Sequence, residues 1–220
     1  MRLLTVFLGS MFLFQHAAAQ NFTLSCNNQE GKETILLKQA PHGAIRISKE
    51  TLEVKFTGGT KRFINTGPDS EQGVHWLYCG YDKKTKTHLI SKLDDARFTG
   101  VILFEKTGNL IDAGHTVAIS PDGKSLLTIE QQDGVDGETW SLENISGKRL
   151  WTGYAGVTQK IGQDTYDSIY AEFKRPRWIN DSVLSADFVC ADKSESIKGV
   201  VTLKHVGGEW KWLPDYKCSK

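Results

Sequence analysis

Side chains capable of acid–base or metal chemistry are present, but none has the spacing of a preformed catalytic or metal site. The histidines beyond residue 19 lack partners at i, i+2 or i, i+4: His42, His75, His88, His115 and His205. Without such a pair, no single strand or helix presents two imidazoles to one ion. We therefore predict structural or surface histidines, with no bound metal and no cofactor.

Motifs for common nucleophiles and for phosphate binding are also missing. The chain has no G-x-S-x-G elbow and no H-E-x-x-H. Gly123-Lys124-Ser125 matches the end of a phosphate-binding loop, but that loop requires glycine where Ala118 stands. We predict a protein that is not an enzyme. An exported hydrolase stays open as an alternative, because a catalytic carboxylate pair has no characteristic sequence spacing.

The segment Glu130–Glu138, E-Q-Q-D-G-V-D-G-E, combines four acids and two glycines between two predicted strands. It is open to three interpretations. It could be a solvated hairpin tip, since acids and glycines are ordinary loop residues. It could be a calcium loop, although the D-x-[DN]-x-[DN]-G spacing is absent. It could enter a partner's cleft, because a charged tip on a rigid sheet can satisfy buried donors there. The partner-binding residues would then be Glu130, Gln131, Gln132, Asp133, Val135, Asp136 and Glu138.

A basic cluster follows later in the chain, at Lys174-Arg175-Pro176-Arg177-Trp178. It could contact an acidic partner surface, but we favour a solvated turn before a strand. The tryptophans at predicted strand positions are expected to be core residues between sheets: Trp140, Trp151, Trp178, Trp210 and Trp212.

Residues 1–19 predict a cleavable secretory signal, with basic Arg2, an apolar run over Leu3–Phe14 and small residues at 17–19. That run is shorter than the roughly 20 residues of a membrane span, so we expect no membrane insertion. The mature chain, residues 20–220, is predicted to be one domain that is periplasmic or secreted. Without Arg2 it has 26 basic and 26 acidic residues, a balance that does not favour nucleic acid as a partner.

Four widely spaced cysteines in an exported chain predict two disulfides: Cys26, Cys79, Cys190 and Cys218. Three pairings are possible. Predicted strands near 183–190, 199–205 and 209–213 would form a meander whose first and third members run parallel. This arrangement would bring Cys190 close to Cys218, so it favours a Cys190–Cys218 disulfide. The two remaining cysteines, Cys26 and Cys79, would then form the second disulfide.

Alternating and β-branched runs separated by turn residues predict an all-β fold of antiparallel hairpins, propeller-like or sandwich-like and irregular. No long amphipathic helix is predicted, and the best helical candidate is a short turn around Lys92–Ala96. E-K-T-G-N-L-I at 105–111 recurs as E-N-I-S-G-K-R-L-W at 143–151, with Gly108 and Gly147 39 residues apart. Blade repeats have periods of about 40 to 45 residues. A third turn, at 206–212, fits this period only if an insertion such as Gly156–Asp167 precedes it.

The turn S-P-D-G-K at 120–124, with strands on both sides, resembles the blade signature of TolB-type and WD40-type propellers. The order of signal, strand, S-P-D-G-K turn, strand, polar loop and strand is similar to periplasmic immunity proteins that neutralise type VI secretion amidase effectors. That resemblance implies a disulfide-bonded pseudo-propeller whose loop at Glu130–Glu138 enters the effector's cleft. A small envelope protein that binds a ligand or acts as an assembly scaffold is the alternative.

Overall fold

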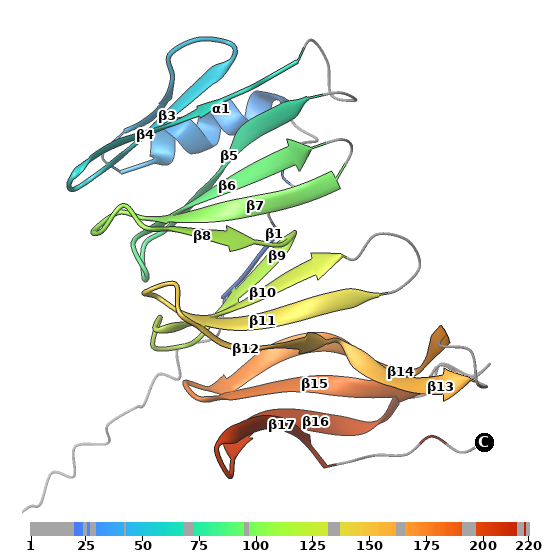
Figure 1. Cartoon of the computed structure of the whole chain (residues 1–220). Coiled ribbons are helices and arrows are strands. Elements are labelled where there is room, and N and C mark those ends of the chain that lie inside the picture. Colours follow the sequence, from blue (N-terminus) through green and yellow to red (C-terminus); the bar gives the residue numbers. More distant parts are fainter. Residues whose placement is uncertain are drawn as a thin grey trace, which may run out of the picture.

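Four antiparallel sheets stack face to face in the order of the chain in the computed structural model (Figure 1). The structure describes residues 20–23, 26, 30–41, 43–67, 73–94, 97–131, 137–161, 166–190, 197–214 and 218. The predicted signal, residues 1–19, lies outside them. Seventeen strands and one helix make up the described part of the chain, which confirms the predicted all-β class.

The first two sheets are simple meanders, in which each strand pairs with the next along the chain. The first sheet contains β2 (Ala44–Arg46), β3 (Thr51–Phe56) and β4 (Gly59–Ile64). The second sheet contains β5 (Val74–Asp82), β6 (Thr87–Asp94), β7 (Arg97–Phe104) and β8 (Leu110–Ala113). The second sheet is a four-stranded meander like a blade of a propeller fold, and the first has one strand fewer.

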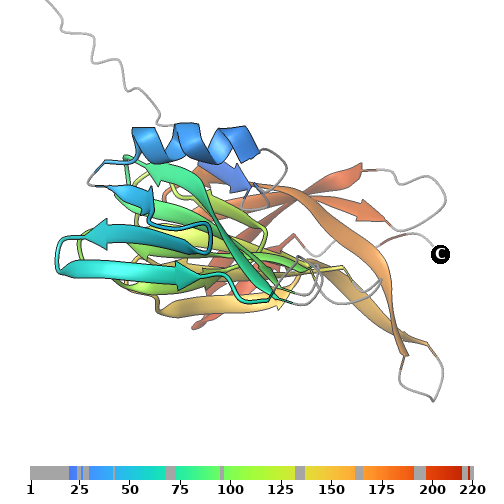
Figure 2. The ribbon, with the colours of Figure 1, turned by 90° about the horizontal axis from the view of Figure 1, so that it is seen from above.

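The third sheet contains β9 (Thr116–Ile119), β10 (Ser125–Gln131), β11 (Glu138–Asn144) and β12 (Arg149–Tyr154). Strand β1 (Gln20–Thr23) joins it by pairing with β9. The fourth sheet contains β13 (Gly156–Ile161), β14 (Tyr166–Asn180), β15 (Val183–Cys190), β16 (Ile197–Val206) and β17 (Glu209–Leu213). Seen along the stack, the β13–β14 hairpin extends beyond the other strands (Figure 2).

A buried apolar cluster fills each of the three spaces between neighbouring sheets. Strand β10 shows how the sequence produces this arrangement. Leu126 belongs to the cluster against the second sheet, and Leu127 belongs to the cluster against the fourth. Successive side chains of a strand point to opposite faces, so a strand buried on both sides has a continuous apolar run. The predicted core tryptophans belong to the cluster between the third and fourth sheets, with Trp140 fully buried.

The internal repeat corresponds to equivalent turns in successive sheets. Gly108 lies between β7 and β8, and Gly147 lies between β11 and β12, each joining the last two strands of its sheet. Their φ angles are +70° and +81°, a conformation that glycine adopts without strain. Gly207 occupies the same place between β16 and β17. The extra strand β13, within the predicted insertion Gly156–Asp167, accounts for the longer interval before this third turn.

The predicted helical turn near Lys92–Ala96 is wrong, because Lys92–Asp94 is the end of β6. The helix is α1 (Glu30–Gln39), which lies beside β5. Leu36 and Leu37 pack on the cluster between the first two sheets. Glu33 fixes the helix by accepting a 2.8 Å hydrogen bond from the backbone N–H of Tyr78. Contact with the sheet, rather than an amphipathic pattern, therefore positions α1.

Both predicted disulfides and their favoured pairing are confirmed. Cys190 is bonded to Cys218 and Cys26 to Cys79, with Cα–Cα distances of 5.7 Å in each pair. The predicted meander is formed by β15, β16 and β17, so the first and third strands end on the same side. Two disulfides indicate folding in an oxidising, exported environment. The described helix is neither long nor apolar enough to cross a membrane.

Candidate functional site

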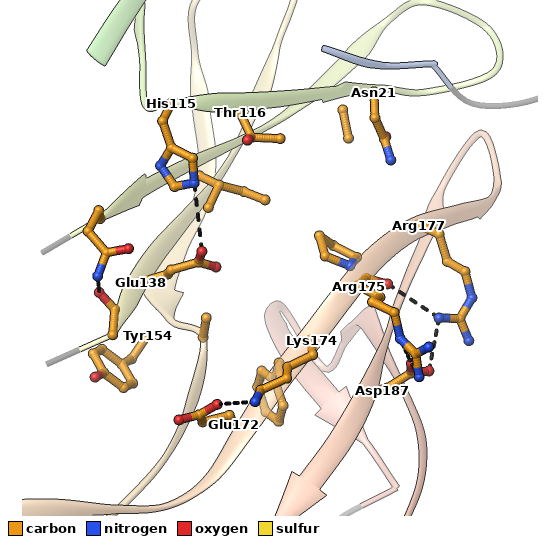
Figure 3. Close-up of a pocket in the computed structure, with 17 residues that line it drawn as sticks. Asn21, His115, Thr116, Glu138, Tyr154, Glu172, Lys174, Arg175, Arg177 and Asp187 are labelled. Atoms are coloured by element: carbon orange, nitrogen blue, oxygen red, sulfur yellow. Dashed lines mark hydrogen bonds and ion pairs between the residues drawn. The ribbon is translucent and has the colours of Figure 1, made fainter. Parts of the chain in front are cut away.

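A cleft of about 940 Å³ opens between the third and fourth sheets. One wall comes from β9, β10 and β11, and the other comes from β14 and β15. A hydrogen bond of 3.1 Å joins the two walls, from Nε1 of Trp178 to the carbonyl oxygen of Ala118. The polar side chains that border the cleft lie on both walls (Figure 3).

The β10–β11 hairpin separates this cleft from a second one, of about 850 Å³, between the second and third sheets. In the hairpin Glu130 is opposite Thr139, and Gln131 is opposite Glu138. Glu130 and Thr139 line the second cleft, whereas Gln131 and Glu138 line the first. The alternation of a strand thus directs two carboxylates of one hairpin into two different clefts.

Three of the seven predicted partner-binding residues have described positions: Glu130, Gln131 and Glu138. They belong to the paired strands rather than to the loop, because β10 extends to Gln131 and β11 begins at Glu138. Their expected placement in a loop is therefore wrong by one or two residues. The remaining four lie outside the described residues: Gln132, Asp133, Val135 and Asp136.

Contacts from both sides hold the carboxylate of Glu138 at the rim of the first cleft. Its Oε2 accepts a 2.9 Å hydrogen bond from Nε1 of Trp140, and its Oε1 lies 3.7 Å from Nε2 of His115. Because Trp140 is fully buried, its indole fixes the carboxylate relative to the core. Figure 3 shows His115 and Glu138 together on the wall formed by the third sheet.

Two arginines of the opposite wall share one buried carboxylate (Figure 3). Nε of Arg175 lies 2.6 Å from Oδ2 of Asp187, and Nη1 of Arg177 lies 2.9 Å from Oδ1. The Asp187 side chain is 7% exposed, whereas the arginine side chains are 67% and 46% exposed. Burial by itself raises the pKa of Asp187, but hydrogen bonds and charge from Arg177 and Arg175 outweigh it. The pKa of Asp187 therefore lies below its ordinary value, and the carboxylate is ionised at neutral pH.

A β-bulge in β14 places these arginines. Lys174 pairs with Asp187 and Arg177 pairs with Ser185, so β14 has one more residue than β15 between these pairs. Arg175 has a φ of +52°, and Pro176 follows it. A bulge accommodates proline, which cannot donate to the ladder. The expected solvated turn before a strand is therefore wrong: the basic cluster is an irregularity inside a strand.

Asp187 is the site residue that sequence reasoning missed. It lies in the apolar strand V-L-S-A-D-F-V-C, and its side chain is almost completely covered. A carboxylate is rarely buried unless it is paired. An acid in such a strand therefore predicts a cationic partner nearby, and this signal was available in the sequence.

The described lining of the first cleft is suited to recognition by charge and hydrogen bonding. Its side-chain hydroxyl groups come from Thr116 and Tyr154, and it contains no serine or cysteine. No group of three or more histidine, cysteine, aspartate or glutamate side chains that could hold a metal ion occurs among the described residues. Comparisons with protein-family models, curated proteins and solved structures found no match to this chain.

Proposed function

We propose that the protein is an exported, non-enzymatic binding protein that inhibits a cell-wall-degrading effector by inserting its β10–β11 hairpin into the effector's active-site cleft. The observation that carries this proposal is the position of the hairpin between two clefts. Glu130 faces one cleft and Glu138 faces the other. A partner that surrounds the hairpin tip would therefore meet a carboxylate on each side.

The hairpin base has the rigidity that such insertion requires. Its two strands pair without a shift from Ser125–Asn144 to Gln131–Glu138, and the sheet packs on both faces. A binding segment held by a rigid scaffold loses little conformational entropy when it docks. Affinity would come from a few desolvated anchors near the centre of the interface.

The compartment and the inhibitory role have different support. The disulfides support export, and we place the protein in the periplasm or outside the cell. The inhibitory role rests on the resemblance of the S-P-D-G-K turn and the following loop to immunity proteins of amidase effectors. The hairpin would block the effector's active site sterically, so inhibition requires no catalytic group on this chain.

Binding of a small ligand in the envelope is the second candidate. The second cleft supports it, because Trp76 and Lys92 lie there with Asp94, and an aromatic ring beside charged groups can bind an organic molecule. Replacing Gln131–Glu138 by a short Gly-Ser linker distinguishes the candidates. Ligand binding survives the replacement, whereas inhibition of an effector is lost.

The direct test uses the mature, disulfide-bonded protein and the hydrolase encoded by the neighbouring gene. The two proteins are co-purified, and hydrolysis of cell wall by the hydrolase is measured with and without the binding protein. A stable complex with reduced hydrolysis is expected. Absence of both the complex and the inhibition rejects the proposed function.

A further inference from the structure

We propose that Arg175 and Arg177 form a binding site for a single carboxylate group in the cleft between the third and fourth sheets. This site goes beyond the proposed function, because it belongs to the fourth sheet rather than to the β10–β11 hairpin. It holds whether or not the hairpin binds an effector.

The two guanidinium groups are fixed but only partly used. Arg175 contacts Asp187 through Nε and Nη2, at 2.6 and 2.5 Å. Arg177 uses Nη1 for Asp187 and for the carbonyl oxygen of Arg175. A guanidinium has five N–H donors. Among the described residues, Nη1 of Arg175 and both Nε and Nη2 of Arg177 have no hydrogen-bond partner, so they remain available to a ligand.

Asp187 prepares the site before a ligand arrives. A free arginine side chain loses rotamer entropy when it is fixed. Here one buried carboxylate fixes two arginines, so much of that entropy is already lost in the unbound protein. A ligand then gains charge-assisted hydrogen bonds without having to order the side chains.

The net charge of the arginine cluster matches a monoanion, whereas the described lining of the whole cleft has three basic and three acidic side chains, with Glu138 on the opposite wall. Arg175, Arg177 and Asp187 together have a charge of +1. The neighbouring Lys174 is neutralised by Glu172, at 3.0 Å. A phosphate dianion has two negative charges, so the +1 charge of the cluster would not neutralise it. It would also be repelled by the carboxylate of Glu172 on the same wall. A carboxylate matches both the charge and the fork geometry of a guanidinium.

The backbone supports a functional role for this position. Arg175 has a left-handed φ of +52° within a strand, which few residues other than glycine adopt. Such a conformation is strained for a residue other than glycine and is concentrated at binding and catalytic sites. In this conformation the Arg175 side chain contacts Asp187, beside Arg177. The carboxylate ligand could be a peptide C-terminus or a small organic acid, which share this chemistry.

The test follows the arginine Nε–Hε signals of the mature protein by NMR at constant ionic strength. The probes are acetate, N-acetyl-trialanine with a free carboxylate, its C-terminal amide and inorganic phosphate. Arg62 is the matched control, because it is 65% exposed and pairs with the single acid Glu53 at 3.0 Å. We expect saturable shifts of Arg175 and Arg177 with acetate and the acid peptide, and no saturable shift of Arg62.

The amide is expected to leave both signals unchanged, and phosphate is expected to bind more weakly than acetate. An acid peptide that binds about tenfold more tightly than acetate identifies a peptide terminus as the source, and equal binding identifies a small acid. Shifts no larger than those of Arg62, equal shifts with the amide, or tighter binding of phosphate would overturn the proposal.

Two variants test the anchoring. Asp187→Asn is expected to weaken acetate binding about tenfold, because the arginines lose their fixed position. Arg175→Lys keeps the charge but removes the fork, and weaker binding is then detected at Arg177 even if Asp187→Asn fails to fold. If Arg175→Lys binds acetate as tightly as the wild-type protein does, Arg175 does not form the proposed carboxylate site. A variant in which only residues 132–136 are replaced by a Gly-Ser linker keeps Gln131 and Glu138 in the cleft lining, so it must bind acetate normally, which separates this site from the proposed function.

Discussion

The indole of Trp178 donates its Nε1 hydrogen to the carbonyl oxygen of Ala118, at 3.1 Å, across the interface of the third and fourth sheets. The two residues are 60 positions apart in the chain. Ala118 belongs to β9, where it pairs with Asn21 of β1 and Leu127 of β10. Trp178 follows directly after Arg177, so this bond also fixes the end of the bulge that presents the arginines to the cleft.

Trp178→Phe is expected to lower the free energy of unfolding by about 2 kcal/mol. The change removes the hydrogen bond between the two sheets and part of a large ring from the core. Urea denaturation measures the effect. Trp210→Phe, at the edge of the same cluster, is the control and should have a smaller effect.

Lowering the pH should destabilise the protein through Asp187. Its pKa is lower in the folded protein than in the unfolded chain, so the unfolded chain binds the proton first. The stabilisation is complete above the unfolded value of about 4 and is lost as the pH falls through the folded pKa. Unfolding in urea at pH 6 and at pH 3 should show a smaller difference for Asp187→Asn than for the wild-type protein. Equal differences would exclude this carboxylate as the source.

Arg175→Gly should be more stable than Arg175→Ala by about 1 kcal/mol. Both variants lose the guanidinium, but only glycine adopts a φ of +52° without strain. In an ordinary strand position alanine is the more stable of the two, so the sign of the difference is informative. Thermal unfolding of the two variants gives the comparison, and a more stable alanine variant would argue against a left-handed Arg175.

Removing the Cys190–Cys218 disulfide by replacing both residues with alanine should destabilise the fold by about 3 to 4 kcal/mol. The bond closes a segment with a sequence separation of 28, and closure reduces the entropy of the unfolded chain. Cys190 is also buried in the cluster between the third and fourth sheets. Denaturation under oxidising conditions measures the loss. A reduced wild-type protein as stable as the oxidised one would contradict this role.

Strands buried on both faces could be predicted from the sequence, because short apolar runs such as Ser125–Ile129 are bounded by turn residues. Strands with polar exteriors were predicted only in part: β17 was predicted from its alternation, and β4 was not. β4, G-T-K-R-F-I, exposes most of its side chains, and the run of β6 ends in residues that resemble a helical turn. The predicted insertion Gly156–Asp167 contains β13 and the start of β14, which the sequence pattern did not predict as strands. These strands are defined by pairing with each other and with β15.

The site was predictable where it depends on local sequence and not where it depends on strand pairing. The acids at Glu130 and Glu138 were identified because they flank a glycine-containing loop. The ion pair between Arg175 and Asp187 was not predicted from the sequence. It joins residues 12 positions apart, and it depends on a β-bulge that no local pattern specifies. The basic cluster and the acid in an apolar strand were both visible in the sequence, but the pairing of Arg175 and Arg177 with Asp187 became apparent only in the fold.

The most direct test of the central claim is the dissociation constant of the complex between the mature protein and the neighbouring gene's hydrolase. It is measured for the wild type, for a variant with Gln131–Glu138 replaced by a Gly-Ser linker, and for a control with the same replacement at the β11–β12 turn, residues 145–148. That turn lies at the opposite end of β11. We expect the hairpin replacement to weaken binding about 100-fold or more, as loss of interface hot spots does, and the control to bind normally. Equal affinity of the hairpin variant and the wild type would contradict the account.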